Sequence, residues 1–103
     1  MTPTFIALLD FDTAPADRRS AVEQLRREQP VIEAMPGCVA FRILEDSRNH
    51  TAITVIHEWV DQPSFAGYLA SDAFARSNEI LRPMMLGSPT SRRFRAELVE
   101  TAG

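Results

Sequence analysis

The strand and helix pattern of the chain is clearest in residues 51–74, which read TAITVIHEWVDQPSFAGYLASDAF. The first nine of these residues include several β-branched side chains and predict a strand over 51–59. Asp61 then suits the N-cap of a helix, with Pro63 in the first turn, where its missing N–H is tolerated. Ser71 is a second N-cap, so the helical region is expected to break there and to start again.

Two further strands and one long helix are predicted before this stretch. Phe5–Asp12 alternates between two faces, and Cys38–Glu45 forms a second strand ahead of a polar turn over 46–50. Between these strands we expect a helix that is capped by Thr13 and that bends or restarts at Pro30.

The last strand is expected over residues 93–98, after a Gly-Ser-Pro loop at 87–89. The resulting order β-α-β-β-α-β is typical of an α+β fold, a ferredoxin-like sandwich with one antiparallel sheet. The chain has 103 residues, 45% of them hydrophobic and 24% charged. This length and balance fit a single globular domain over residues 1–103.

Charge and motif content argue against several classes of protein. Fourteen acidic and eleven basic residues give a net charge of −3, without the basic excess of a nucleic-acid-binding protein. The longest apolar run, Phe5–Leu9, is too short to span a membrane, and no leader segment is recognisable. The single cysteine, Cys38, excludes an intrachain disulfide, and no metal-binding spacing or phosphate-binding glycine loop is present. We therefore expect a cytoplasmic protein without metal or cofactor and without nucleic-acid or membrane partners.

One face of the predicted sheet is left without a cover, because the two helical regions occupy the other. Its residues are mostly apolar: Ile6, Leu8, Ala40, Leu44, Ala52 and Ile56. An uncovered apolar face usually marks an interface, so we expect a homodimer packed sheet against sheet. Arg42, an isolated charge in this region, favours a salt bridge in the dimer over a substrate contact.

His57 and Trp59 are the first candidate site residues, because strand alternation places them on one face. Both also fit a structural role, the indole as a large core residue and the imidazole as a hydrogen-bonded one. In a functional role, the indole stacks on a planar ligand, and the imidazole is a base or a hydrogen-bond donor. Tyr68 and Asn78 lie on the second helical region, as rim residues or as ligand contacts.

Residues 58–74, EWVDQPSFAGYLASDAF, resemble the antibiotic biosynthesis monooxygenase family, and Pro36-Gly37-Cys38 is similar to its PGC turn. The resemblance extends from about Phe5 to Leu98. It implies a dimeric ferredoxin-like α/β barrel with a pocket between sheet and helices in each subunit. It also implies an activity, since several members oxidise anthrones or quinols with O₂ and without flavin, haem or metal. In such reactions the substrate itself supplies the electrons.

The resemblance also implies site positions. Trp59 matches a tryptophan of the anthrone-oxidising members, whereas Val55 and Phe65 stand where those members have an asparagine and a tyrosine.

Haem-degrading relatives imply a second set of positions. Leu9, Tyr68 and Asn78 stand where these relatives have an asparagine, a tryptophan and a haem-ligating histidine. An asparagine amide cannot replace an imidazole as an axial iron ligand, which argues against haem degradation.

The leading hypothesis is a cofactor-independent monooxygenase that oxidises a planar phenolic, quinol or polyketide-like compound with O₂. In this hypothesis Trp59 binds the substrate and His57 is a general base whose pKa lies close to the working pH. An isomerase or cyclase that uses His57 for proton transfer is an alternative. A non-catalytic small-molecule-binding or stress-response module is another.

Overall fold

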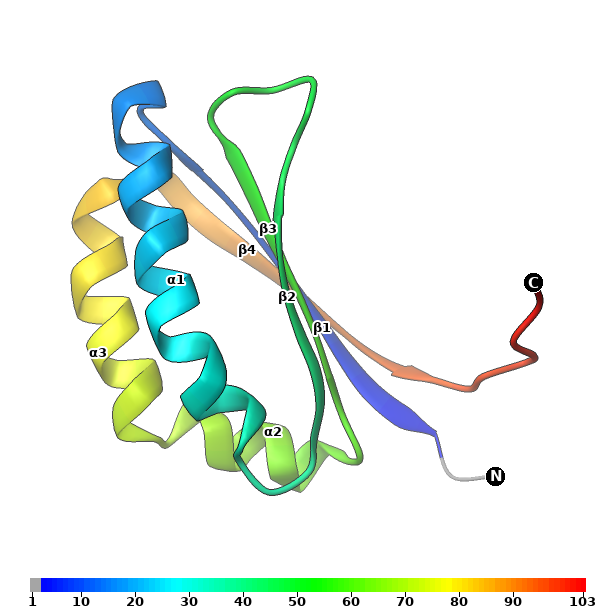
Figure 1. The fold of residues 1–103 in the computed structure, drawn as a ribbon. Helices are drawn as coiled ribbons and strands as arrows, with labels where there is room; N and C mark the ends of the chain where they lie inside the picture. The colour runs from blue at the N-terminus through cyan, green and yellow to red at the C-terminus, as the bar shows by residue number, and fades with distance from the viewer. Residues whose placement is uncertain (1–2) are drawn as a thin grey trace.

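Four antiparallel strands form one sheet in the computed structural model, which describes residues 3–103 (Figure 1). The strands lie in the order β2-β3-β1-β4, with bounds β1 (Thr4–Thr13), β2 (Cys38–Glu45), β3 (Ala52–Trp59) and β4 (Met85–Ala96). The helices are α1 (Arg18–Glu33), α2 (Gln62–Leu69) and α3 (Asp72–Leu81), with short 3₁₀ turns η1 (Pro15–Asp17) and η2 (Arg82–Met84). The predicted βαββαβ ferredoxin-like α+β fold is confirmed.

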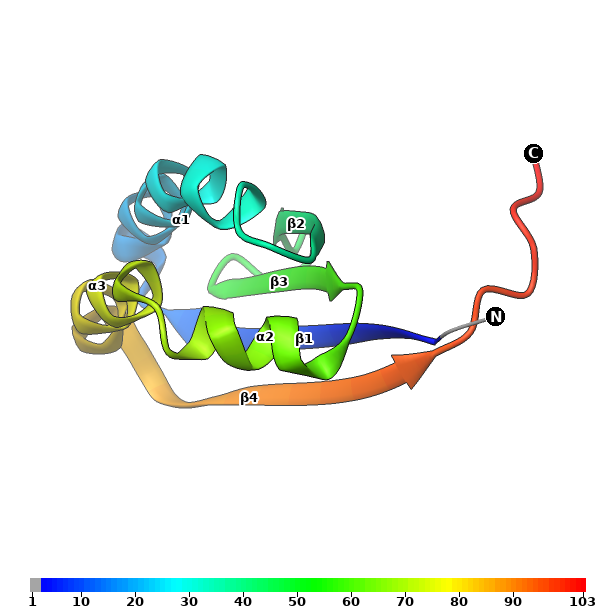
Figure 2. The same ribbon diagram turned by 90° about the horizontal axis from the view of Figure 1, so that it is seen from below.

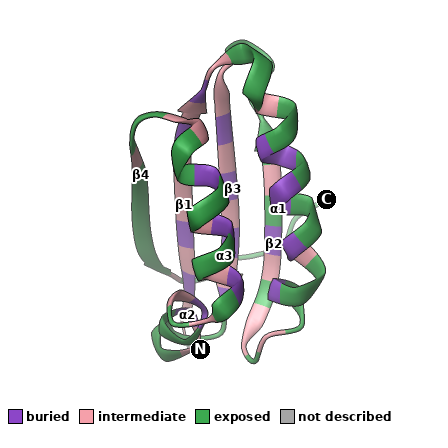
Figure 3. Cartoon of the chain, turned by 90° about the vertical axis from the view of Figure 1, so that its left-hand side faces the viewer, coloured by how far each residue is buried: buried purple, intermediate pink, exposed green. Residues whose placement is uncertain are grey.

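Alternation along β1 and β3 separates an inner from an outer face of the sheet. Buried residues, purple in Figure 3, alternate with partly exposed ones along both strands. The inner face packs against apolar side chains of all three helices, which lie on one side of the sheet (Figures 1 and 2). Strand β4 is mostly exposed and lies at the sheet edge away from α1 (Figure 3). The inner side of the sheet next to β4 is therefore the more open part of the fold.

Two side-chain caps divide the second helical region as predicted. The Asp61 carboxylate accepts a hydrogen bond from the Ser64 backbone N–H at 2.8 Å and starts α2. The Ser71 hydroxyl accepts one from the Phe74 N–H at 3.2 Å and starts α3. Because the chain changes direction between the two caps, side chains from both helices can face the same space above the sheet.

Gly37 joins α1 to β2 with a positive φ of 83°, a conformation that favours glycine. Glycine is required here for a second reason, because a Cβ atom at this position would collide with the Ser64 side chain. The turn before β2 therefore packs closely against the first turn of α2.

The start and the end region of α1 differ from the prediction. Thr13 is not the N-cap: it is the last residue of β1, it is buried, and its hydroxyl donates to the Ala14 carbonyl at 2.8 Å. Pro15 begins a separate 3₁₀ turn, so that Asp17 precedes α1. Of the two alternatives predicted for Pro30, a bend or a restart, the restart is wrong, since α1 continues to Glu33. Pro30 lies in the last turn, where it removes only one hydrogen bond of the helix.

The predicted loop at residues 87–89 is instead part of β4, which begins at Met85. The pairing of β4 with β1 shifts here, because Asp10 faces Thr90 whereas Asp12 faces Leu86. The extra residues form an irregularity of the bulge type, with Gly87 at a φ of 72°. The glycine and proline that indicated a loop therefore mark a distortion within a strand.

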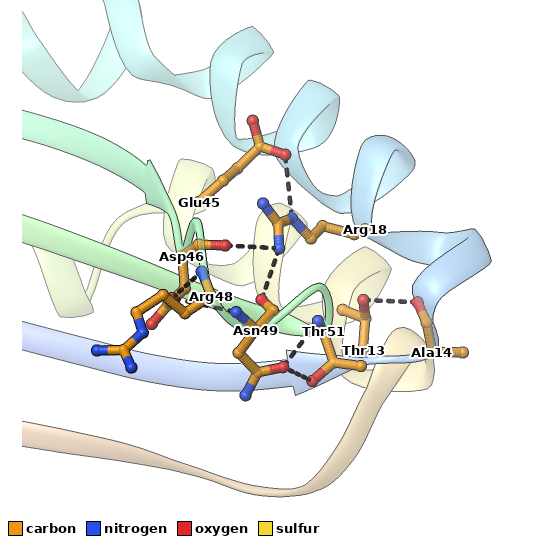
Figure 4. Close-up of polar contacts among 8 residues, drawn as sticks. All are labelled: Thr13, Ala14, Arg18, Glu45, Asp46, Arg48, Asn49 and Thr51. Atoms are coloured by element: carbon orange, nitrogen blue, oxygen red, sulfur yellow. Dashed lines mark hydrogen bonds and ion pairs between the residues drawn. The ribbon is translucent and has the colours of Figure 1, made fainter.

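Polar contacts fix the turn between β2 and β3 to the beginning of α1 (Figure 4). The Arg18 guanidinium donates to the Glu45 carboxylate at 3.1 Å, and it donates to the backbone carbonyls of Asp46 at 3.2 Å and Asn49 at 2.8 Å. An exposed ion pair of this kind contributes about 0.2–1 kcal/mol. These contacts hold the hairpin in place, and we assign them a structural role.

No helix of residues 3–103 lies on the outer face of the sheet (Figure 1). Five of its apolar residues are partly buried, and Leu44 and Phe94 are 41% and 44% exposed. The predicted apolar face is present, with the five partly buried residues being Ile6, Leu8, Ala40, Ala52 and Ile56.

No helix within residues 3–103 combines the length and the apolar character that a membrane crossing requires.

Candidate functional site

A cavity of about 250 Å³ lies on the inner side of the sheet, between β1, β3 and β4 and the helices α2 and α3. Its volume is close to the lower end of the range for small-molecule sites. Most of its lining is apolar or aromatic, and five of the predicted site residues line it together: Leu9, His57, Phe65, Tyr68 and Asn78.

Trp59 and Val55, the other two predicted site residues, do not line this cavity. They are 0% and 1% exposed and belong to the hydrophobic core. Tyr68 stacks on the indole, with ring centroids 5.4 Å apart and an interplanar angle of 28°. The tyrosine, which lines the cavity, therefore lies where the indole was expected to meet a ligand.

His57 is held in one orientation by Trp59. The indole Nε1–H donates a hydrogen bond to His57 Nδ1 at 2.9 Å, with the imidazole 4% exposed. An indole nitrogen can only donate, so Nδ1 is unprotonated and the proton of the neutral ring is on Nε2. Aromatic rings surround the imidazole, with centroid distances of 5.4 Å to Phe41, 5.5 Å to Phe65 and 5.4 Å to Tyr68.

The Nε2–H of His57 is available to a ligand. This nitrogen makes no hydrogen bond in residues 3–103, and the same part of the chain contains no fully buried side-chain nitrogen or oxygen without a partner. Nε2 therefore keeps accessible surface, and His57 lines the cavity. The geometry presents a hydrogen-bond donor to whatever occupies this space.

The environment of His57 lowers the pKa of the imidazole to about 4. Burial is the main cause, because it disfavours the charged ring, and the positive charge of Arg93 adds to the effect. This pKa lies well below the near-neutral value expected of a general base. At neutral pH the imidazole is uncharged, its Nδ1 accepts a hydrogen bond from Trp59, and its Nε2–H is free to donate one.

Tyr68 is a second polar residue in the lining of the cavity, with its ring centroid 5.4 Å from that of the imidazole. Burial is again the main cause of a pKa raised to about 12, so the phenol is protonated at neutral pH. Its hydroxyl makes no hydrogen bond in the described part of the chain, and by the same reasoning it keeps accessible surface. His57 and Tyr68 are thus two neutral polar groups at the buried end of the cavity.

Two arginines at the exposed end were not predicted as site residues. The Arg82 Nε–H donates to the Asn78 carbonyl Oδ1 at 3.2 Å. The Arg93 guanidinium lies 4.9 Å from the centroid of the Phe65 ring. The sequence pattern could have indicated Arg93. Residues 93–98 alternate between the two faces of a strand, so either Arg93 or Phe94 must face inward. The position of Arg82 follows from the turn η2, which the sequence pattern does not specify.

Two other hollows lie at the surface around α2, with volumes of about 300 Å³ and 460 Å³. The first contains Arg95, whose guanidinium already donates to the Gln62 carbonyl at 2.8 Å. Neither is lined by an imidazole or a phenol. Across residues 3–103, no group of three or more His, Cys, Asp or Glu side chains is placed to hold a metal ion.

Comparison with solved structures confirms the fold. A proposed antibiotic biosynthesis monooxygenase from Nitrosomonas europaea superposes with a TM-score of 0.90 at 12% identity, over 99% of this chain and 97% of that chain. A conserved protein from Methanosarcina mazei gives 0.88 at 14% identity, over 93% and 95% of the two chains. A protein from Deinococcus radiodurans gives 0.88 at 13% identity, over 96% and 99%. At these identities the likeness establishes the fold alone.

No curated protein sequence matches the chain. The sequence model of one family, described as antibiotic biosynthesis monooxygenase, does match it over residues 4–79. This range covers most of the chain, from β1 into α3, and it includes His57, Trp59 and Tyr68. The chain therefore belongs to the antibiotic biosynthesis monooxygenase family.

Proposed function

We propose that the protein is a cofactor-independent monooxygenase that oxidises a planar phenolic, quinol or polyketide-like compound with O₂. One observation carries the proposal: a neutral imidazole, oriented by Trp59, presents its Nε2–H to an aromatic-lined cavity that Tyr68 also lines. Such donors stabilise an oxyanion that forms on a substrate. Membership in the family supports a monooxygenase-like or small-molecule-binding role.

For an anthrone-type substrate, the reaction balances without a further reductant. Transfer of a proton from the ring CH₂ to solvent gives an anion whose charge is delocalised onto an oxygen. This oxygen accepts hydrogen bonds from His57 Nε2–H and the Tyr68 hydroxyl, which lowers the energy of the anion. The anion transfers one electron to O₂, and the two radicals combine to form a C–O bond. The peroxide anion takes a proton back from solvent, loses water and leaves a carbonyl, so one oxygen atom stays in the product and the other leaves as water.

Oxygen uptake tests this proposal directly. Protein that has been dialysed against a chelator is mixed with a panel of anthrones and quinols, and O₂ consumption is followed above the uncatalysed rate. With an anthrone we expect one O₂ per carbonyl formed and, under ¹⁸O₂, one labelled atom in the product. Conversion of the substrate without O₂ would indicate an isomerase or cyclase. Saturable binding without conversion would indicate a binding module, and either result would contradict the proposal.

Replacing His57 distinguishes its role as a donor from that of a base. His57→Leu removes the Nε2–H, and kcat/KM should fall by about 10²-fold, as expected for loss of one oxyanion donor. His57→Gln keeps an amide N–H donor and an oxygen that can accept from Trp59, so it should retain most of the activity. If His57→Gln were as inactive as His57→Leu, a proton-accepting role would be supported instead, because an amide accepts no proton at neutral pH.

We further propose that the protein is a homodimer in which the outer sheet faces pack together. The apolar residues on this face support the proposal, together with two charges, Arg42 and Glu58. Neither side chain forms an ion pair within residues 3–103, although both belong to the same hollow of the outer face. A two-fold axis brings the same surface of two copies together, so that Arg42 of each copy can meet Glu58 of the other.

A charge-reversal series tests this dimer by light scattering at micromolar concentration. The unmodified chain should have twice the mass of a monomer. Arg42→Glu should weaken the dimer, and the double variant Arg42→Glu with Glu58→Arg should restore it. Arg48→Glu, in the turn between β2 and β3, is the control and should leave the mass unchanged. A stable monomer of the unmodified chain, or no rescue in the double variant, would contradict this arrangement.

A further inference from the structure

We infer that the cavity selects an aromatic acid, a substrate whose phenolic ring carries a carboxylate that Arg82 and Arg93 bind. This inference rests on the proposed function, because it specifies the substrate of the same site. It starts from the charges that line the cavity. Both charged residues in the lining are basic, and no aspartate or glutamate lines it. The whole chain has a net charge of −3, so the positive character of this cavity is local.

Within residues 3–103, neither of the two guanidinium groups has a carboxylate partner. The ion pairs among residues 3–103 join Arg18 to Glu45, Arg76 to Glu28 and Arg92 to Asp10, and they do not include Arg82 or Arg93.

Within residues 3–103, the side chains that accept hydrogen bonds from Arg82 and Arg93 are neutral. Arg82 donates to the Asn78 amide at 3.2 Å, and Arg93 donates to the Ser91 hydroxyl at 3.3 Å. These contacts orient the guanidinium groups and leave their charge uncompensated. Each keeps free N–H groups, and a guanidinium can donate two parallel hydrogen bonds to a carboxylate.

The position of the arginines suits a substituent on an aromatic ring. His57 and Tyr68 are buried, whereas Arg82 and Arg93 are exposed, so the cavity has an aromatic inner end and a basic outer end. Arg93 lies over the Phe65 ring, which itself lines the cavity. Its charge also reaches the inner end, since it contributes to the lowered pKa of His57. A ring whose phenolic oxygen accepts a hydrogen bond from His57 Nε2–H therefore directs a neighbouring carboxylate toward the arginines.

Binding of two matched probes tests this inference in the absence of oxygen. The probes are 1-hydroxy-2-naphthoic acid and its methyl ester, which differ in the charge of one substituent. Trp59 is the single tryptophan of the chain and stacks on Tyr68, so its fluorescence reports occupancy of the cavity. We expect the acid to bind about 10-fold more tightly than the ester, with an advantage that decreases as salt is added because both arginines are exposed. Equal affinities, or no binding of either probe, would overturn the inference.

Arginine variants assign the preference to the two named side chains. Arg82→Gln and Arg93→Gln should each reduce the preference for the acid, and the double variant should abolish it while ester binding is retained. Arg95→Gln is the matched control, because Arg95 is an exposed arginine of the same strand that bonds Gln62 and does not line this cavity. A preference that survives in the double variant, or that is lost equally in Arg95→Gln, would overturn the assignment.

The outcome is separate from that of the proposed function, because no turnover occurs without O₂. Preferential binding of the acid together with no oxygen uptake would leave an anion-selective binding site and reject the monooxygenase. Oxygen uptake with neutral quinols together with equal affinities would support the monooxygenase and reject the aromatic acid.

Discussion

Trp59→Ala should lower the free energy of unfolding by about 3–5 kcal/mol, the range found for deletion of a buried tryptophan side chain. Trp59 is 0% exposed, stacks on Tyr68 and packs against Phe65, with ring centroids 6.4 Å apart. The substitution leaves a cavity and also removes the donor to His57 Nδ1. A domain of this size has a total stability of about 5–15 kcal/mol, so the variant should be close to unfolding. Urea denaturation followed by circular dichroism measures the change.

Trp59→Phe keeps the test informative if the alanine variant does not fold. It retains most of the ring volume and loses the indole N–H, so it should cost about 1–3 kcal/mol through the unpaired acceptor and the smaller ring. Val60→Ala is the matched control, since the neighbouring side chain is 48% exposed, and it should change stability by less than about 0.5 kcal/mol. A Trp59→Ala variant as stable as Val60→Ala would show that the indole is not a core residue.

The sequence predicted the elements whose signals are local. Asp61 and Ser71 cap their helices through hydrogen bonds to backbone N–H groups only three residues away, and both caps were found. The features that were predicted wrongly depend on contacts with more distant parts of the chain. Thr13 continues β1 because the strand pairs with β3 and β4, and the stretch 87–89 is drawn into β4 by its pairing with β1. Pairing between distant strands overrides the local turn preference of Gly-Ser-Pro.

The candidate site was predictable to the extent that alternation and helix position determine it. Strand period alone placed His57 and Trp59 on the inner face, and five of the seven named residues line one cavity. The two-residue period of a strand does not show how deeply a side chain is buried. It therefore could not reveal that Tyr68 stacks on Trp59 and separates the indole from the cavity. It also gives no hydrogen-bond direction, and the bond from the indole is what makes His57 a donor.

Lowering the pH from 7 to 4 should cost the unmodified protein about 3 kcal/mol of stability relative to His57→Gln. In the folded protein the His57 pKa is lowered to about 4, whereas the unfolded chain has the ordinary value of about 6.5. Above pH 6.5 the imidazole is neutral in both states and makes no difference to stability. Between pH 6.5 and 4 only the unfolded chain takes up the proton, which favours unfolding. At about 1.4 kcal/mol per pH unit of separation, the loss is about 3 kcal/mol and is nearly complete at pH 4.

The comparison with His57→Gln isolates this contribution, because the carboxyl groups that titrate over the same range are common to both proteins. Urea denaturation at a series of pH values gives the free energy of unfolding of the two proteins as a function of pH. The difference between these free energies should increase as the pH falls below 6.5. Arg93→Gln should reduce this difference in unfolding free energy. It removes the positive charge that, together with burial, lowers the pKa of His57. NMR titration of the imidazole gives the folded pKa directly, with His50→Gln used to assign the two histidine signals. Parallel stability curves for the unmodified protein and His57→Gln would show that the folded imidazole accepts a proton as readily as the unfolded one, and His57 would then be free to act as a base.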